Sequence, residues 1–307
     1  MLNALTLGAH GELEAIRVAY QSAYADYLAA QASYNAARDD LLASLSKLGI
    51  VTQKAMLALE QSYRIILYPV AGSFQNIGSF STDSMAEAHP KLEHIHQLFS
   101  NYSAVESAAG GLGAGSAVAI GSWSLVSIIG TASTGTAISS LTGIAATNAT
   151  LAWFGGGALA AGGFGMAGGT LLLGGLALVP LVAFSSWHAR SKIKDIAAET
   201  INVNTEAGRA VERIPELRQA QSEAEQQRRV LINLFADLDR QLAATKRLIF
   251  PTRASKVRKF ARRLFGKEVF NDHETKAAQS LELAATRVAA LFRPAELLPD
   301  RSQPSWM

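Results

Sequence analysis

The feature that most restricts the fold of this chain is a long segment without charge. No Asp, Glu, Lys or Arg occurs between Ser107 and Ala189. A soluble domain carries about 25% charged residues on average, so a gap of this length is difficult to solvate. Two apolar stretches lie within it, about Ala108–Gly130 and about Leu151–Phe184, joined by a Thr, Ser and Gly-rich stretch. Each exceeds the roughly 20 residues that a helix needs to cross a bilayer, which predicts a membrane hairpin.

A buried hairpin at the centre of a soluble bundle is the alternative interpretation. Glycine, alanine, serine and threonine insert only weakly into membranes, and these residues dominate the segment. The first stretch also interleaves four serines, at Ser116, Ser122, Ser124 and Ser127. Such weak hydrophobicity allows both states, because a hairpin that packs against amphipathic helices in water could be released into lipid by a trigger.

Residues flanking the second stretch predict how it leaves the membrane. Trp187 is followed by Arg190, Lys192 and Lys194, the aromatic and basic order found on the cytoplasmic side of a span. Trp153 and Trp187 are therefore the expected interface anchors, with a break of the helix near Gly155–Gly157. Both termini are expected in the cytoplasm, and the N-terminus lacks the basic and apolar regions of a cleavable signal peptide.

Glycines are concentrated before this exit, and GFGMAG at Gly163–Gly168 formally matches a nucleotide-binding pattern. No β-branched strand precedes the motif, no acid follows about 20 residues later, and no Lys-Ser or Lys-Thr follows a glycine run, so we expect no nucleotide cofactor.

In the same glycine-rich segment a small residue recurs at every fourth position, which on a helix forms a ridge for close helix packing. The ridge consists of Gly157, Ala161, Gly165 and Gly169.

The charged flanks carry helical patterns with a seven-residue spacing. Leu13–Leu48 is predicted as one helix that Gly49 ends, followed by a second helix at about Val51–Tyr68 and a third that starts near Asp83 and continues into the uncharged segment. Tyrosines and leucines mark one seam position and alanines the other, which favours a close partner helix. These residues are Tyr20, Tyr27, Tyr34, Leu41 and Leu48, with Ala23, Ala30 and Ala37.

A long polar helix is predicted at about Ser191–Phe250, and a further helix near Glu274–Phe292. Pro215 is expected to kink or divide the long helix, and Pro251 to end it. Its apolar stripe has the spacing of a coiled coil. The stripe comprises Leu217, Ala224, Leu231, Phe235, Leu238, Leu242 and Ile249.

A basic amphipathic segment, TRASKVRKFARRLFGK, follows the long helix. One predicted face is apolar, with Val257, Phe260, Ala261, Leu264 and Phe265. The remaining positions are the expected membrane-surface bases, Lys256, Arg258, Lys259, Arg262, Arg263 and Lys267. Such a helix suits the surface of an anionic membrane. The alternative is a solvated helix that packs its apolar face on the bundle.

No constellation of residues predicts catalysis. His89, Glu93, His94 and His96 lie close in sequence, but His94 and His96 point to nearly opposite sides of a helix and cannot share a metal ion. The chain contains no cysteine, and no nucleophile elbow or carboxylate pair stands out. The net charge of +3 is too small to indicate nucleic-acid binding, and no stacking aromatics are interleaved with the bases. We expect a non-enzyme without cofactor, metal or nucleic acid.

These patterns predict an all-α protein built from long antiparallel coiled-coil helices that flank an apolar hairpin. Four regions are expected. They are an N-terminal helical region at 1–106, a membrane hairpin at 107–189, a long C-terminal helix at 190–250, and a basic helix, terminal helix and Pro-rich tail at 251–307.

Long heptad helices on both sides of an uncharged, glycine-rich hairpin resemble the α-helical pore-forming proteins of the cytolysin A type. They are more loosely similar to the colicin pore domain and to the membrane-addressing region of apolipoprotein L. The resemblance implies membrane insertion, oligomerisation and permeabilisation of a lipid bilayer, which the basic helix predicts to be anionic. The alternative is a constitutive two-span membrane scaffold or adaptor that docks a protein partner through its coiled coil.

Overall fold

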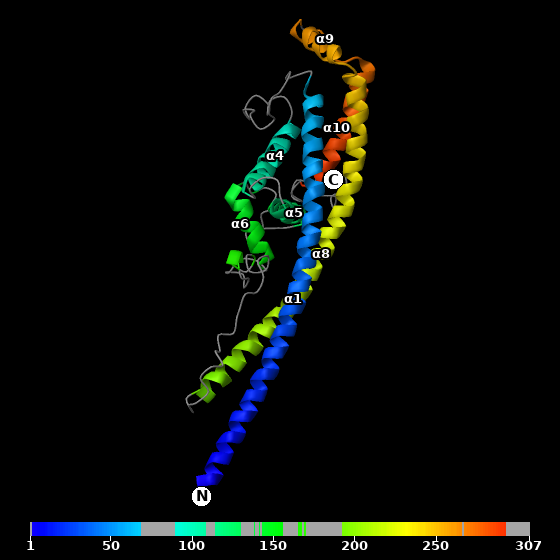
Figure 1. The fold of residues 1–307 in the computed structure, drawn as a ribbon. Helices are drawn as coiled ribbons and strands as arrows, with labels where there is room; N and C mark the ends of the chain where they lie inside the picture. Colours follow the sequence, from blue (N-terminus) through cyan, green and yellow to red (C-terminus); the bar gives the residue numbers. More distant parts are fainter. Residues whose placement is uncertain are drawn as a thin grey trace, which may run out of the picture. The chain divides into compact units, whose positions relative to one another are not determined.

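The described residues of the computed structural model form an all-α fold (Figure 1). They are residues 2–68, 90–108, 114–129, 138, 141, 143–155, 165–167, 169, 192–265 and 267–292. The all-α prediction is confirmed. In chain order the helices are α1 (Leu2–Ile66), α4 (Pro90–Ala108), α5 (Ala114–Ile129), α6 (Gly143–Phe154), α8 (Lys192–Ile249), α9 (Arg253–Leu264) and α10 (Asp272–Ala290).

The chain divides into two compact units that cut across the four regions predicted from the sequence. Residues 2–42 of α1 and 192–221 of α8 form unit 1. Unit 2 contains the rest of these two helices together with α4, α5, α6, α9 and α10. Each unit therefore contains one part of α1 and one part of α8.

In unit 1, the apolar stripes predicted on α1 and α8 are buried. Tyr20, Tyr27 and Tyr34 lie in the core of this unit, where desolvation raises the pKa of each phenol. Because side chains seven residues apart lie on the same helix face, this core is continuous along both helices. Its other members include Ala23, Ala30, Ala37, Val203, Ala210 and Leu217.

In each unit, α1 and α8 run parallel, so the antiparallel arrangement predicted for them is wrong. In unit 1, burial and the nearby carboxylate of Glu199 raise the pKa of Tyr20, and burial and the carboxylate of Glu206 raise that of Tyr27. A later residue of α1 is therefore paired with a later residue of α8. In unit 2, the Ser44 hydroxyl donates to Glu225 at 3.3 Å, and the Lys246 ammonium, further along α8, donates to Gln61. Heptad spacing defines which face of a helix is buried, but both directions of the partner satisfy it.

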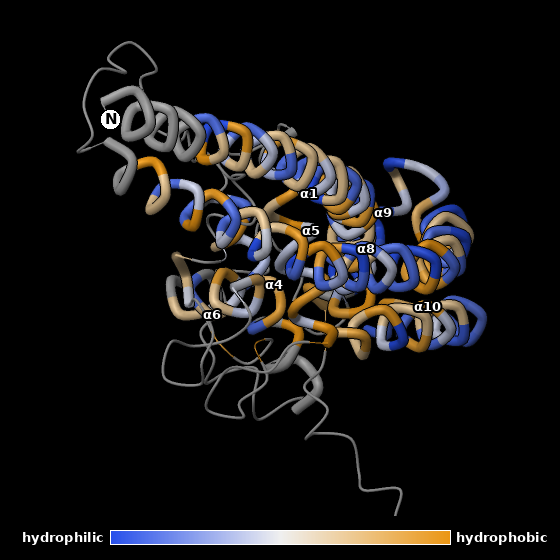
Figure 2. The backbone as a smooth tube through the Cα atoms, turned by 90° about the horizontal axis from the view of Figure 1, so that it is seen from below, coloured by the Kyte–Doolittle hydropathy of each residue, from blue (hydrophilic) through white to orange (hydrophobic). Residues whose placement is uncertain are grey.

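The antiparallel arrangement does hold between α8 and α10 of unit 2. The hydroxyl of Thr245 donates to the carbonyl of Ala277, and Arg287, further along α10, lies 3.9 Å from Asp237, earlier in α8. Hydrophilic and hydrophobic residues alternate along both helices (Figure 2). The predicted stripe of α8 is buried at Leu217, Ala224, Leu231, Leu238, Leu242 and Ile249, and half-buried at Phe235.

Gly49 does not end a helix, because α1 continues through it to Ile66. The reason is a close approach to α5: a methyl group at Gly49 would lie 2.8 Å from the nitrogen of Gly121, and one at Gly121 would lie 2.7 Å from the carbonyl carbon of Leu45. Real Cβ atoms are essentially never closer than 3.0 Å. The two glycines therefore let the backbones of α1 and α5 touch, and this close packing offsets the low helix propensity of glycine.

The first uncharged stretch forms α5, which is 16 residues long and buried in unit 2. Trp123 stacks on Phe292 beyond the end of α10, with ring centres 5.6 Å apart, and also contacts Tyr102 of α4. The hydroxyl of Thr52 on α1 donates to Ser124 at 2.9 Å. These contacts occupy several sides of α5, as the buried-hairpin alternative predicted for this stretch.

The polar turn predicted within the uncharged hairpin is wrong in part. The stretch between the apolar segments was expected to be a polar turn, but α6 begins within it, at Gly143, and is 12 residues long. The third predicted helix was expected to continue into the uncharged segment, and α4 (Pro90–Ala108) does so as far as Ala108, whereas α5 is a separate helix that begins at Ala114. Its predicted start near Asp83 lies outside the described residues. The helices α4, α5 and α6 pack against one another in unit 2.

The later helices agree better with their predicted bounds. Pro215 lies inside α8 without dividing it, and α8 ends just before Pro251, as predicted. The final helix starts with a capping box at Asn271, whose side chain accepts from the backbone N–H of Glu274 at 2.9 Å. This arrangement satisfies two backbone donors that the first turn of a helix otherwise leaves without partners.

Candidate functional site

The basic segment predicted as a membrane-surface helix forms α9, which is connected to α8 by a short turn. The hydroxyl of Ser255 donates to the carbonyl of Thr252 at 2.6 Å, and the Ser255 N–H donates to the Thr252 hydroxyl at 3.3 Å. These hydrogen bonds satisfy polar groups of the first helical turn, where no intrahelical partner exists. They therefore fix where α9 begins.

The face that α9 turns toward the rest of unit 2 is polar, and its apolar face is exposed. Lys259 is 6% exposed and Ser255 is 4% exposed. In contrast, exposure is 69% for Val257, 51% for Phe260 and 73% for Leu264. An amphipathic helix of a globular protein ordinarily shows the opposite arrangement. The alternative of α9 packing its apolar face on the bundle is therefore wrong.

We call Val257, Phe260, Leu264 and Phe265 the apolar stripe of α9. Phe265 directly follows the helix and is 74% exposed. Ala261, the fifth predicted member, is half-buried. Isolated apolar side chains are normal on protein surfaces, but four large ones on a single face form a patch of the kind that marks interaction sites.

Basic side chains border this stripe. Those of Lys256, Arg258, Arg262 and Lys267 are exposed. Arg263 belongs to α9, but its side chain lies outside the described part of the structure. Lys259 was predicted to face the membrane, and this prediction is wrong because its ammonium is buried in an ion pair with Glu274.

An aromatic cluster connects α9 to the ends of α1 and α8. The ring of Tyr68 lies edge-on to Phe250 at 5.3 Å and stacks with Phe270 at 6.4 Å. The ammonium of Lys256 lies over Phe250 at 5.7 Å, and the Tyr68 hydroxyl donates to the Lys256 carbonyl at 3.5 Å. Cation–π contacts and paired aromatic rings each contribute modestly to the stability of a fold. Together they fix the base of α9.

The predicted glycine ridge is only partly described, and at Gly165 its backbone departs from a right-handed helix. Gly157 and Ala161 lie outside the described residues. Gly165 has a φ of 57°, which a right-handed helix does not contain. A methyl group at Gly169 would lie 2.7 Å from the carbonyl carbon of Leu151, so this glycine does allow close backbone approach to α6.

The two predicted interface anchors have different outcomes. Trp153 lies on α6, where its ring is half-buried and edge-on to Phe154 at 5.1 Å. Trp187 lies outside the described residues. The contact of either tryptophan with a membrane stays a prediction. Trp123, which the sequence did not single out, is buried in the core of unit 2.

The described residues contain neither a metal-binding cluster nor a membrane-spanning helix. Among the described side chains, no cluster of His, Asp and Glu could hold a metal ion. His89 and the side chains of Glu93, His94 and His96 fall outside that set. Within the part of the chain that the structure describes, no helix combines the length and the apolarity that crossing a bilayer requires. The absence of enzymatic activity stays a prediction.

Comparisons with protein-family models, curated proteins and solved structures give no match to this chain.

Proposed function

We propose that this chain is a helical membrane-binding protein that attaches to the surface of anionic bilayers through α9. One observation carries the proposal, namely that the apolar stripe of α9 is exposed while Lys259, on the opposite face, is buried. Helices that lie in a membrane interface have an apolar face that enters the acyl boundary and bases that meet the lipid phosphates.

The charges beside the stripe favour lipid over another protein surface. Lys256, Arg258, Arg262 and Lys267 are exposed around it, and each basic residue near an anionic membrane contributes about 1 kcal/mol. Burying a large apolar side chain contributes about 1.5–3 kcal/mol when burial is complete. The two contributions together make binding measurable without any helix that spans the membrane.

Flotation with vesicles tests the proposal. Phosphatidylcholine vesicles containing phosphatidylserine should bind the protein, and pure phosphatidylcholine vesicles should bind it much more weakly. Replacing Phe260 and Leu264 with serine should weaken binding about 100-fold, since about 3 kcal/mol of apolar transfer is lost. The matched control replaces Leu248 and Leu283, two exposed leucines outside α9 that are 47% and 57% exposed.

Two results would contradict this proposal. Equal binding by the α9 variant and its control would show that the stripe does not enter lipid. A dimer that dissociates when Phe260 and Leu264 are replaced, without vesicle binding by the parent protein, would show that a second copy of the chain covers the stripe.

Membrane permeabilisation, implied by the resemblance to pore-forming proteins, is a second candidate function that one feature of α5 favours. The hydroxyls of Ser122 and Ser127 and the indole N–H of Trp123 are buried and find no hydrogen-bond partner among the described residues. A buried polar group without a partner costs about 1–3 kcal/mol. These costs weaken the packing of α5 in unit 2, so its release into a membrane is less unfavourable.

A reversible cross-link separates permeabilisation from surface binding. The hydroxyls of Thr52 and Ser124 are hydrogen-bonded, and the chain has no cysteine, so Thr52→Cys with Ser124→Cys introduces one pair that can connect α1 to α5. Oxidation should abolish dye leakage but leave flotation unchanged, and reduction should restore leakage. Leakage from the oxidised protein would exclude release of α5. The two-span scaffold would bind vesicles without leakage under both conditions.

A further inference from the structure

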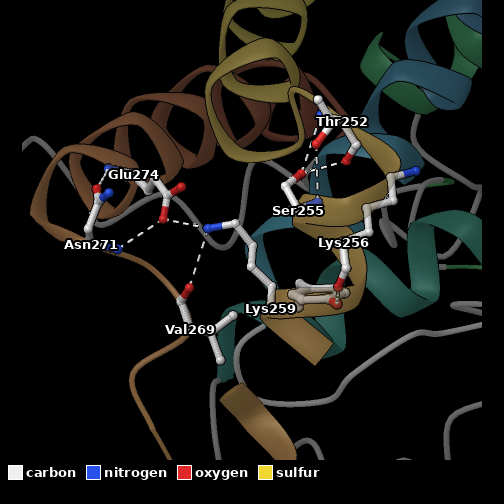
Figure 3. A network of polar contacts seen from close by, with 8 residues as sticks. Thr252, Ser255, Lys256, Lys259, Val269, Asn271 and Glu274 are labelled. Carbon is white, nitrogen blue, oxygen red and sulfur yellow. Dashed lines mark hydrogen bonds and ion pairs between the residues drawn. The ribbon is translucent and has the colours of Figure 1, made fainter. Parts of the chain in front are cut away.

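The buried ion pair between Lys259 and Glu274 does not itself meet the membrane in the function proposed above, but it lies on the face of α9 opposite the apolar stripe. The Lys259 ammonium lies 2.6 Å from a Glu274 carboxylate oxygen and 3.4 Å from the carbonyl of Val269, and 5.2 Å from the centre of the Phe270 ring. Figure 3 shows the Lys259 side chain extending between Glu274 and Val269. This single lysine therefore connects α9 to α10 and to the turn before it.

Glu274 is held in place independently of Lys259. Its carboxylate accepts the backbone N–H of Asn271 at 3.0 Å, as part of the capping box that starts α10. The first turn of a helix favours a negative charge, because its free N–H groups point toward that end. Unit 2 thus presents a fixed carboxylate, and α9 has one lysine that reaches it.

The position of Lys259 on α9 determines what this ion pair does. With about 100° per residue, Lys259 lies about 160° around the helix from Val257 and about 140° from Leu264. Pairing Lys259 with Glu274 therefore turns the apolar stripe away from unit 2. Rotation of α9 to bury the stripe would remove the ammonium from its carboxylate and leave a buried charge without a partner, which is strongly unfavourable.

We propose that the Lys259–Glu274 ion pair is the positioning element that sets the rotation of α9 about its own axis and keeps the apolar stripe exposed for the membrane. Its role in membrane binding rests on the function proposed above. The rotation itself does not, because it can be measured without lipid. Buried ion pairs often add little net stability, and specifying one arrangement among several is the best-attested of their uses.

Single cysteines can measure this rotation, since the chain contains none of its own. Leu264→Cys places a thiol in the exposed stripe, and Ser255→Cys places one on the buried face. Each reporter is combined with Lys259→Met or with Glu274→Gln, and the rate of thiol modification is measured in the absence of lipid. Glutamine at 274 keeps an oxygen that can accept the Asn271 N–H but removes the charge.

Loss of the ion pair should change the two reporters in opposite directions. In both variants, the thiol at 264 should react about tenfold more slowly and the thiol at 255 about tenfold faster, because thiol reactivity follows exposure. Lys259→Arg should behave as the parent protein, because a guanidinium can pair with the same carboxylate. The charge-matched control is Lys54→Met, which removes an exposed lysine of α1 in unit 2.

Several results would overturn the proposal. Unchanged rates at both reporters in Lys259→Met and Glu274→Gln would show that other contacts set the rotation. Faster reaction at both positions with loss of helicity would show that the ion pair only holds α9 folded. If the rates change as expected but the parent protein does not bind anionic vesicles, the rotation is established and the membrane function alone is contradicted.

Discussion

Replacing Gly121 with alanine tests whether direct backbone contact between α1 and α5 stabilises unit 2. The new methyl group would overlap the carbonyl oxygen of Leu45 and would also lie 2.7 Å from its carbonyl carbon, about 0.8 Å closer than the roughly 3.5 Å at which two carbons attract. The atoms that it meets belong to the main chain of α1. No flexible side chain can move aside, so the two helices must separate.

The expected loss of stability follows from two opposing contributions. Overpacking costs about 1–3 kcal/mol, and a clash with main-chain atoms belongs at the upper end of that range. Alanine in turn stabilises the helix by about 1 kcal/mol relative to glycine. We therefore expect Gly121→Ala to lower the free energy of unfolding of unit 2 by about 2 kcal/mol. Gly49→Ala should have a similar effect, since its methyl group would lie 2.8 Å from the Gly121 nitrogen.

Urea unfolding provides the assay, with Trp123 as the fluorescent probe because it is buried beside Gly121. Trp153, Trp187 and Trp306 are replaced by phenylalanine in all variants, so that Trp123 alone reports. The control is Gly208→Ala in α8, where a methyl group would meet nothing within 4 Å. Circular dichroism should show that this control is stabilised by about 0.4–1 kcal/mol. Stabilisation of Gly121→Ala by the same amount would refute the reasoning.

Three further predictions concern charge, capping and pH. Replacing Arg258 and Arg262 with glutamine should weaken flotation with anionic vesicles about 30-fold at low salt, with little difference at about 1 M salt. The charge-matched control replaces two exposed arginines of α8, Arg218 and Arg229. Asn271→Ala should lower the free energy of unfolding measured in urea by about 1 kcal/mol, because α10 loses its N-cap. Asn271→Ser should retain most of that stability, because serine is also a good N-cap residue. Burial raises the pKa of Tyr102 above its usual 10.0, so the folded state holds this proton more tightly than the unfolded state. The contribution of the Tyr102 proton to the free energy of unfolding is therefore fully present below pH 10.0 and is lost as the pH rises above that value. Tyr102→Phe should consequently reduce alkaline unfolding in a pH titration.

The buried faces of the long helices could be predicted from the sequence, but the direction of the helices could not. Seven-residue spacing places Tyr20, Tyr27 and Tyr34 on one face, and all three are buried. The same spacing is satisfied by a parallel or an antiparallel partner. The segment between α1 and α8 is long, so no tight turn in the sequence decides between the two directions.

Gly49 shows why local rules place a helix end incorrectly. Glycine after a heptad run normally indicates a C-cap, and nothing near it in sequence predicts otherwise. Its actual partner, Gly121, lies on a different helix. A pair of glycines at helix-compatible positions in two segments is the signal that could have suggested the contact, but the sequence contains many such pairs.

For the candidate site, the amphipathic pattern of α9 was predictable and its rotation was not. The pattern identifies the apolar face and the bases beside it. Which face is exposed depends on the ion pair of Lys259 with Glu274, 15 residues away across a turn. A lysine within a run of bases gives no sign that it is the buried member.

The most direct test of membrane binding through α9 is an environment-sensitive dye on a single cysteine. The dye is placed at Leu264 in the apolar stripe or at Leu283 on α10, which is also exposed. Vesicles containing phosphatidylserine should shift the emission of the dye at 264 to the blue, and brominated lipids should quench it, while the dye at 283 stays unchanged. Emission at 264 that is unaffected by vesicles that bind the protein, or equal shifts at both positions, would contradict insertion of the α9 stripe.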